Sequence, residues 1–128
     1  MSSLVIDSSA WIEYFGATSR GRVIRERIQG EKNILITGVI ITEVLVKHLK
    51  AGLPTEQVVT ALSSLSRMLP FDIRLSQETA KVYVEQRKKQ GKFGLADAHI
   101  VALARLNAAK VLTFDTDFTG IPEAIILR

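Results

Sequence analysis

Two apolar segments of the sequence end in carboxylates. Asp7 follows the run Leu4–Ile6, and Asp115 and Asp117 follow residues 111–114. Aspartate suits helix caps and turns, so each of these residues alone has an ordinary structural explanation. Acids at the ends of strands can also form a metal site. Carboxylates gathered around Mg²⁺ or Mn²⁺ support phosphodiester chemistry, because the metal activates a bound water and stabilises charge on the phosphate.

A further acid, Glu43, lies among apolar residues in the segment "VIITEVLV". At helical spacing, Val39, Ile40 and Val46 are its apolar neighbours. Lys47 follows Glu43 at i+4, which allows a surface ion pair. An ionised carboxylate on an apolar face is costly unless it is paired or bound to a metal. The sequence leaves both explanations of Glu43 open.

Asp97 comes three residues after Gly94, in the first turn of an expected helix. The helix dipole favours an anion there, so Asp97 alone also has an ordinary explanation. The residues that follow, Ile100, Val101 and Leu103, are apolar. They predict a buried helix whose N-terminus lies at the edge of a sheet.

The four positions together favour a metal site over four separate structural roles. Converging carboxylates repel one another, so they need a cation or raised pKa values. The chain has no cysteine, and His48 and His99 do not have the spacing of a metal-binding pair. We expect His99 to be packed or solvent-facing, and Mg²⁺ or Mn²⁺ to be the cofactor. The candidate catalytic and metal-binding acids are Asp7, Glu43, Asp97 and the closely spaced Asp115 and Asp117. Ser8, Ser9 and Thr113 are candidates to support the site by hydrogen bonds to the first carboxylate, or have ordinary structural roles, as at the start of a helix.

The chain is basic, with a net charge of +4 and a pI of about 9.6. This balance modestly favours an anionic partner such as nucleic acid, although many basic proteins bind no nucleic acid. Two clusters of basic residues are candidates for contact with the phosphates of RNA: Arg20, Arg22, Arg25, Arg27, Arg87, Lys88, Lys89 and Lys92.

The composition indicates a folded domain. The chain has 128 residues, of which 47% are hydrophobic, so it can bury a sizeable core. Its longest apolar run, residues 100–104, is far shorter than the roughly 20 residues of a membrane span. We find no secretory signal. We therefore expect a single cytoplasmic domain over residues 1–128, with no membrane contact.

Short apolar runs alternate with segments of helical spacing, which predicts a parallel sheet covered on both faces. The expected strands are residues 4–6, 33–37, 71–73, 110–114 and 124–127. The expected helices are residues 9–15, 18–30, 38–52, 55–68, 76–91 and 95–109, with Ser76 as the N-cap of the fifth. In such folds, sites form at the carboxyl ends of the strands, where Asp7 would lie.

Four motifs in this order, "VIDSSAWIEYF", "TEVL", "GLADAHIVALA" and "VLTFDTDF", resemble those of PIN-domain proteins. The likeness is greatest to the VapC-type toxins of prokaryotic toxin–antitoxin pairs, and it covers essentially the whole chain. It implies an α/β/α fold with a parallel sheet of strand order 3-2-1-4-5. It also implies an endoribonuclease that depends on Mg²⁺ or Mn²⁺, a homodimer, and inhibition by a VapB-type antitoxin.

The resemblance also implies roles for individual acids. Asp7 matches the acid of the first strand, Glu43 the helix acid, and Asp97 the acid that opens the buried helix. Asp115 and Asp117 both fall in the motif of the fourth acid. We favour Asp115 as the fourth acid, with Asp117 supporting it, and we expect Asp7 and Asp97 to be direct metal ligands.

Two alternatives remain at the level of sequence. A phospho-acceptor receiver domain has adjacent acids after its first strand and an acceptor aspartate at the end of its third. This chain has "IDSS" after the first strand and only Asp72, within "FDI", near the expected third. The other alternative is a PIN-like module that binds RNA or protein without catalysis. Such a module would normally lack one or more acids, whereas all four positions are filled here.

Overall fold

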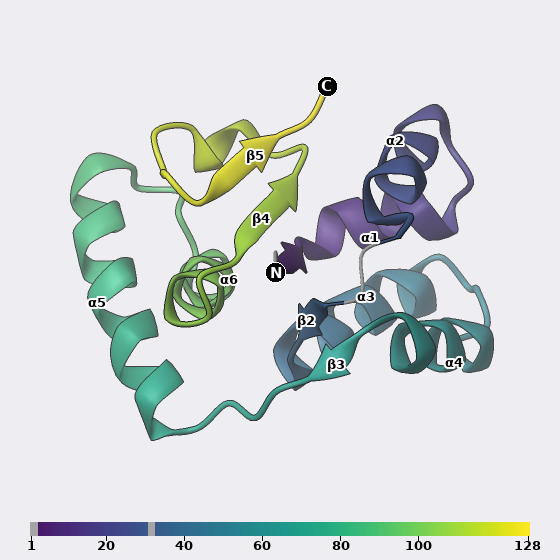
Figure 1. Ribbon diagram of the computed structural model, residues 1–128, viewed down its shortest axis with the longest axis horizontal. Coiled ribbons are helices and arrows are strands. Elements are labelled where there is room, and N and C mark those ends of the chain that lie inside the picture. The colour runs from purple at the N-terminus through teal and green to yellow at the C-terminus, as the bar shows by residue number, and fades with distance from the viewer. Residues whose placement is uncertain (1–2, 31–32) are drawn as a thin grey trace.

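The computed structural model describes residues 3–30 and 33–128, and its centre is a five-stranded sheet (Figure 1). The strands are β1 (Leu4–Ile6), β2 (Ile34–Ile36), β3 (Arg67–Met68), β4 (Lys110–Thr113) and β5 (Ala124–Ile126). All neighbouring strands pair in parallel, in the order β3-β2-β1-β4-β5. The expected strand order is confirmed. A receiver-like sheet would have the order 2-1-3-4-5, so this alternative does not fit the topology.

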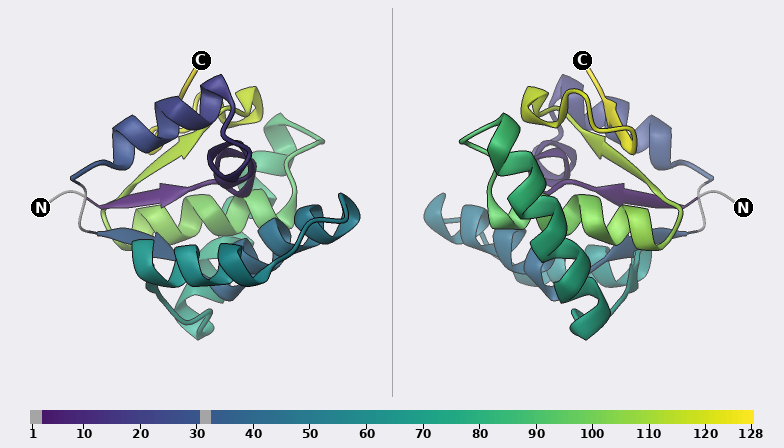
Figure 2. Two further views of the ribbon diagram at one scale, coloured as in Figure 1. Left: turned by 90° about the vertical axis from the view of Figure 1, so that its right-hand side faces the viewer. Right: turned by 90° about the vertical axis from the view of Figure 1, so that its left-hand side faces the viewer.

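Helices cover both faces of the sheet. They are α1 (Ser8–Phe15), α2 (Ser19–Ile28), α3 (Gly38–Lys50), α4 (Glu56–Leu65), α5 (Ile73–Lys89) and α6 (Leu95–Leu106). In Figure 1, α5 and α6 lie on one side of the strands, and α1, α2 and α4 lie on the other. Figure 2 shows α6 between α5 and the sheet. The expected three-layer α/β/α architecture is therefore confirmed.

The apolar sequence of α6 is explained by this central position. Its residues from Ala98 to Ala104 are all buried, between the sheet on one side and α5 on the other. Because the helix is buried along most of its length, its N-terminus is held firmly against the carboxyl edge of the sheet. Asp97, in the first turn, is carried there with it.

The prediction of a third strand at residues 71–73 is wrong. The third strand is β3, a two-residue edge strand in which Arg67 pairs with Leu35 and Met68 with Ile36. Both β3 side chains are exposed, so an apolar pattern could not reveal it. Phe71 instead stacks on the ring of His99.

The expected boundaries around α5 are also wrong. The helix begins at Ile73, and Asp72 is its N-cap, accepting a hydrogen bond from the Leu75 backbone N–H at 2.9 Å. Ser76, the expected N-cap, lies inside the helix and donates to the backbone oxygen of Asp72. The preceding helix α4 ends at Leu65, three residues before the expected end.

Strands β1 and β4 are neighbours, and this register positions the candidate site. Ile6 pairs with Leu112, and the Asp7 backbone N–H donates to the Leu112 carbonyl at 3.0 Å. The residues that follow β1 and β4 therefore lie close together at the carboxyl edge of the sheet. Among the described residues, no helix is long and apolar enough to cross a membrane.

Candidate active site

Asp7 is buried at the end of β1, with 5% of its surface exposed. Its Oδ2 accepts two hydrogen bonds, each of 2.9 Å, from the hydroxyls of Ser9 and Thr113. Although Asp7 occupies the N-cap position of α1, its side chain makes no capping hydrogen bond. Helix capping therefore does not account for an aspartate at this position.

Burial raises the pKa of the Asp7 carboxyl above its ordinary value. The hydrogen bonds from Ser9 and Thr113 stabilise the ionised form and oppose this shift, whereas the nearby Asp115 adds to it. The net shift of the pKa is upward, so the two hydrogen bonds stabilise the ionised carboxylate by less than burial destabilises it. A cation beside Asp7 would reverse this balance.

Thr113, at the end of β4, joins two of the acids. Its hydroxyl donates to Asp7 and accepts from the backbone N–H of Asp115 at 2.9 Å. Asp115 in turn accepts from the backbone N–H of Asp117 at 2.8 Å, which caps the short 3₁₀ helix Thr116–Phe118. Asp115 therefore has a local structural role as well as a position beside the other acids.

Glu43 projects from α3 and is partly buried. Its Oε1 is buried and has no hydrogen-bond partner, and Glu43 forms no ion pair with Lys47. Burial raises the pKa of the Glu43 carboxyl first, and the charges of Asp7 and Asp97 raise it further. Lys47 and the hydroxyl of Ser8, which is itself buried, lower it.

Asp97 occupies the first turn of α6, as the sequence predicts. Its Oδ2 accepts a hydrogen bond of 2.9 Å from the Gly94 backbone N–H, which is the ordinary role of an acid in a first turn. Burial nevertheless raises the pKa of Asp97 above its ordinary value. The effect of burial exceeds that of the hydrogen bond from Gly94, which lowers the pKa. The charges of Asp7, Asp115 and Asp117 raise the pKa further.

The carboxylates at this edge interact through their charges, but they do not form a closed cage. Among residues 3–30 and 33–128, no group of three or more His, Asp or Glu side chains lies close enough together to hold a metal ion alone. Mg²⁺ characteristically binds through one or two carboxylates and keeps several waters, so a closed cage is not required. The unpartnered Glu43 oxygen and the buried Asp7 fit such an ion chemically.

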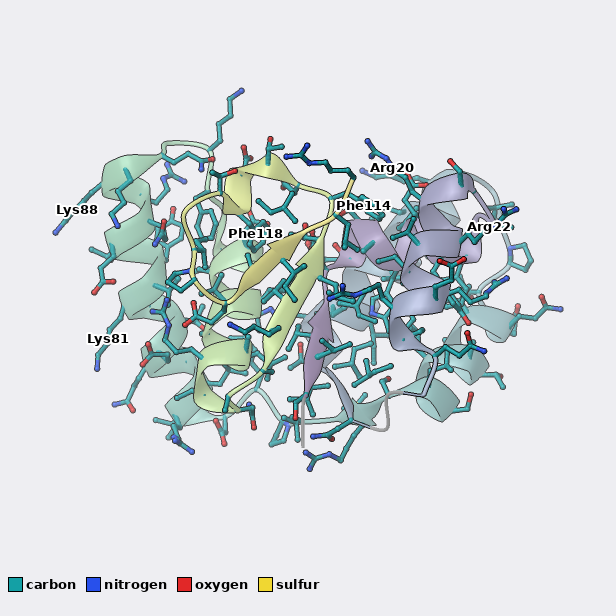
Figure 3. The ribbon with its side chains drawn as sticks, turned by 45° about the horizontal axis from the view of Figure 1, so that its top comes forward. Arg20, Arg22, Lys81, Lys88, Phe114 and Phe118 are labelled. Carbon is teal, nitrogen blue, oxygen red and sulfur yellow. The ribbon has the colours of Figure 1, made fainter. Side chains whose placement is uncertain are left out.

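The two basic clusters differ in their relation to this edge. Arg20 lies over the ring of Phe114, the residue between Thr113 and Asp115, at 5.1 Å from the ring centroid. Figure 3 shows Arg20 beside Phe114 at the end of β4, with Arg22 farther out on α2. Arg25 lies over the Tyr14 ring instead.

The position of α2 depends on a glycine. A Cβ at Gly21 would lie 2.1 Å from the backbone oxygen of Glu13 in α1, so only glycine allows this approach. The close packing of α2 on α1 fixes the helix from which Arg20 projects. A sequence pattern does not reveal this contact.

The second basic cluster belongs largely to the outer surface of α5. Arg87 lies over the Tyr83 ring and donates hydrogen bonds to the Tyr83 hydroxyl and the Phe93 backbone oxygen. Lys88 projects away from the fold (Figure 3). Lys89 and Lys92 are exposed as well, as are Arg22 and Arg27 in the first cluster.

A hydrogen bond that the sequence did not predict lies at the end of β2. The hydroxyl of Thr37 and Nε2 of His99 are 2.7 Å apart, and both side chains are buried. Burial lowers the pKa of His99 from 6.5 to about 4, so the imidazole is neutral at pH 7. Of the two placements expected for His99, packed or solvent-facing, the structure shows the packed one.

Comparisons with known proteins agree with this fold. Residues 4–124 match the family model described as PIN domain. A chain of a toxin–antitoxin complex from Klebsiella pneumoniae is 25% identical, with a TM-score of 0.71 over 95% of both chains. A chain of DNA-bound VapBC from Salmonella typhimurium is 21% identical, with a TM-score of 0.77 over 99% of this chain and 98% of that one. VapC20 of Mycobacterium tuberculosis, a toxin that cleaves the sarcin-ricin loop, is 14% identical, with a TM-score of 0.73 over 98% of both chains. No curated protein sequence matches the chain significantly.

Proposed function

The chain belongs to the PIN-domain family, and from that premise we propose that it is an endoribonuclease dependent on Mg²⁺ or Mn²⁺. The observation that carries the proposal is the group of carboxylates at one sheet edge. Burial and mutual repulsion raise the pKa values of Asp7, Glu43 and Asp97 in the absence of a cation. A divalent cation removes this electrostatic conflict.

We assign Asp7 and Asp97 as the residues that would hold the metal directly, with Glu43 and Asp115 as further acidic ligands. When bound, the metal supplies an activated water and neutralises charge on the scissile phosphate. Thr113 and Ser9 hold the Asp7 carboxylate in one orientation through their hydroxyls. Ser8 supports the site by facing Glu43. Asp117 supports it by positioning Asp115.

The structural likeness to chains of toxin–antitoxin complexes, a VapBC complex among them, favours a role as the toxin of a type II toxin–antitoxin system. In that role the protein would act on RNA in the cytoplasm, as a homodimer, and a VapB-type antitoxin would inhibit it. A PIN-like module that only binds RNA or protein is the remaining alternative. Metal-dependent cleavage distinguishes the two.

The basic residues of both clusters are proposed to contact the phosphates of the RNA. We rank Arg20 first, because its stacking on Phe114 holds its guanidinium next to the acidic edge. Arginine has a planar group that binds phosphate through two parallel hydrogen bonds. The exposed lysines of the second cluster would instead attract RNA from a distance.

The test is cleavage of a single-stranded RNA by purified protein with Mn²⁺ or Mg²⁺. We expect cleavage with either metal, none in excess EDTA, and recovery when Mn²⁺ is restored. Asp7→Asn serves as the control against a contaminating nuclease. Cleavage that persists undiminished in EDTA, or in the Asp7→Asn protein, would refute the proposal. Metal binding without cleavage would favour the binding module.

A further inference from the structure

Gln90, at the end of α5, makes a long-range contact with the loop that carries Asp115 and Asp117. It is the C-cap of the helix, and its Nε2 donates a hydrogen bond of 2.9 Å to the backbone oxygen of Asp117. The end of α5 and the loop between β4 and β5, which contains Asp117, lie side by side (Figure 1). Within the part of the chain that the structure describes, no other side chain outside residues 115–119 donates a hydrogen bond to that segment.

The acceptor of this hydrogen bond belongs to the turn that orients Asp115. The backbone N–H of Asp117 donates to Oδ1 of Asp115 at 2.8 Å, and the backbone N–H of Phe118 donates to the Asp115 carbonyl at 3.2 Å. The N–H of Asp117 thus holds the Asp115 carboxylate, while its carbonyl is held by Gln90. A change at Gln90 can therefore reach the Asp115 carboxylate through a single residue.

An aromatic contact joins the same two segments. Phe93, three residues after Gln90, packs edge to face on Phe118, with ring centroids 5.6 Å apart and planes 66° apart. Both rings are fully buried. Figure 3 shows Phe118 in the loop between β4 and β5. This contact anchors Phe118 in the core, whereas the hydrogen bond from Gln90 fixes the polar backbone of the residue before it.

The turn that follows α5 also holds the acid that faces this loop. Gly94 donates its backbone N–H to Oδ2 of Asp97 at 2.9 Å. Residues 90–94 therefore contact both Asp97 and the turn that begins at Asp115. The charge of Asp115 raises the pKa of Asp97, so the two acids act on each other across this edge. Their separation depends on the contacts of residues 90–94.

The amide of Gln90 is not explained by the stability of α5. Its Oε1 is buried and has no hydrogen-bond partner among the described residues. An unpaired buried acceptor is costly, and an apolar side chain of the same length would avoid this cost. The donor of the amide, in contrast, has a defined partner in the acidic loop. The contact with Asp117 is therefore the feature that accounts for a glutamine at this position.

We propose that Gln90 is a positioning residue of the metal site, which holds the turn of Asp115 and Asp117 opposite Asp97. The inference rests on the proposed function, and it adds an uncharged residue that none of the four motifs contains. Hydrogen bonds that orient metal ligands typically raise metal affinity by roughly ten- to a hundredfold. Because Gln90 acts on Asp115 through the backbone of Asp117, we expect a contribution at the lower end of this range.

The test is Gln90→Met, which preserves the length of the side chain and removes both polar atoms. Mn²⁺ binding to the full protein is measured from the electron paramagnetic resonance signal of free Mn²⁺. We expect the dissociation constant to rise about tenfold and the cleavage rate to recover at saturating Mn²⁺. The midpoint of urea unfolding in EDTA should change little, because removal of the unpaired acceptor offsets the lost hydrogen bond. A purely structural role would give the reverse, lower stability with unchanged Mn²⁺ affinity.

Amide hydrogen exchange in EDTA tests the same contact without metal. The N–H of Asp117, which is bonded to Asp115, should exchange roughly two- to tenfold faster in Gln90→Met, as expected for one lost hydrogen bond. The N–H of Val111, which is bonded to the Glu123 carbonyl, is the internal reference and should exchange at an unchanged rate.

Two further variants isolate the role of Gln90. Gln29→Met is the matched control, because Gln29 is the exposed C-cap of α2 and precedes β2, at the opposite edge of the sheet. It should alter neither the exchange rates nor the Mn²⁺ affinity. Asp115→Asn keeps an acceptor for the Asp117 N–H but removes the ligand charge. In that background, Gln90→Met should cause no further loss of Mn²⁺ affinity, because its effect passes through Asp115.

Any of three results would overturn the proposal. They are an unchanged Mn²⁺ dissociation constant in Gln90→Met, unchanged exchange of the Asp117 N–H, and losses of affinity that add fully in the double variant. If the wild-type protein binds Mn²⁺ and cleaves RNA, these results leave the proposed function intact. A wild-type protein that binds no Mn²⁺ would refute the metal site, and the positioning role of Gln90 with it.

Discussion

Asp7 and Thr37 occupy equivalent positions on neighbouring strands, but their surroundings differ. Asp7 follows β1 and Thr37 follows β2, which pair in parallel. Both residues are N-caps of the next helix, and neither side chain caps that helix. Asp7 accepts hydrogen bonds from the hydroxyls of Ser9 and Thr113, whereas Thr37 is bonded to His99.

Burial disfavours the charged form of the ionisable group at both positions, and this shifts the two pKa values in opposite directions. It raises the pKa of Asp7 and lowers that of His99, because a charged group is disfavoured in either case. The pair of Thr37 and His99 is complete as a neutral hydrogen bond. The acids around Asp7 repel one another, and under the proposed function a cation relieves this repulsion. Metal dependence should therefore appear at the end of β1 and be absent at the end of β2.

The largest difference is expected in catalysis. Asp7→Asn preserves shape but removes a ligand charge, and we expect cleavage to fall by at least about a hundredfold, because several kcal/mol of metal-derived stabilisation are lost. Thr37→Val leaves the buried His99 nitrogen unpaired. It should cost about 1–3 kcal/mol of stability and leave the Mn²⁺ dependence of cleavage intact. Circular dichroism and rate measurements on both variants test this, and equal losses of activity would contradict it.

The pH dependence of stability separates the two positions by sign. In EDTA, the carboxyls of Asp7, Glu43 and Asp97 have pKa values above their ordinary ones. They therefore stabilise the folded protein at a pH below the ordinary carboxyl pKa. This stability is lost as the pH rises through the raised pKa values. The lowered pKa of His99 contributes stability above 6.5 that is lost as the pH falls towards 4. A shift of that size corresponds to roughly 3 kcal/mol for His99.

Urea unfolding between about pH 4 and 7 measures the sum of these opposing contributions. His99→Gln should remove the loss of stability on acidification, so that the acids dominate and stability rises as the pH falls. The slope is the readout, since a uniform packing loss in this variant does not change it. An unchanged slope would mean that His99 is already accessible to protons in the native state.

Metal binding should stabilise the native protein. At about 100 times its dissociation constant, Mn²⁺ adds roughly 2.7 kcal/mol to the free energy of unfolding if it binds only the folded state. We expect Asp97→Asn to lose most of this gain and Thr37→Val to keep it. Thermal melting with EDTA and with Mn²⁺ provides the comparison. A wild-type protein whose melting temperature ignores Mn²⁺ would contradict a metal site at this edge.

The difference between the two strand ends also separates what the sequence could predict from what it could not. The apolar runs before Asp7 and Thr37 predict β1 and β2 because these strands are buried on both faces. The acid at the end of β1 is likewise visible in sequence. The bond between Thr37 and His99 joins residues 62 apart, and no local pattern contains it.

The wrong predictions around β3 also arise because the local sequence pattern does not contain the contacts and exposure of these residues. Arg67 and Met68 are exposed on an edge strand, so their side chains give no period-2 pattern. Phe71 looks like a strand residue, but it is apolar because it packs on His99 at the mouth of a cavity. Asp72, within the same segment, is a helix cap. An apolar residue at the mouth of a cavity thus resembled a strand residue in the sequence.

We expect a smaller difference between the contributions of Arg20 and Arg22 to RNA binding. Arg20 stacks on Phe114 near the acids, whereas Arg22 lies farther out on the same helix (Figure 3). Loss of one phosphate contact lowers the slope of log affinity against log salt by roughly 0.7 for a single strand. Arg20→Gln should show this decrease in an RNA titration, and Arg22→Gln, its matched control, should not. Equal slopes would assign both residues to the general surface charge.

The smallest effect expected is also the one that decides whether Asp97 is more than a helix-stabilising acid. As a first-turn anion that accepts from Gly94, Asp97 should stabilise α6, and Asp97→Asn would then cost about 0.3–1 kcal/mol. Burial and the charges of Asp7 and Asp115 act in the opposite direction. The raised pKa of Asp97 means that these unfavourable influences exceed the hydrogen bond in the metal-free protein. Asp97→Asn should therefore raise stability in EDTA.

The control for this sign is the same substitution at the start of another helix. Asp72 is an exposed N-cap that accepts from Leu75 in α5, away from the acidic edge. Asparagine caps about as well as aspartate, so Asp72→Asn should lose only the favourable charge and destabilise by a few tenths of a kcal/mol. Urea unfolding in EDTA at pH 7 compares the two variants. If both lower the stability by similar amounts, Asp97 is an ordinary first-turn anion, and the repulsion that a cation would relieve is absent.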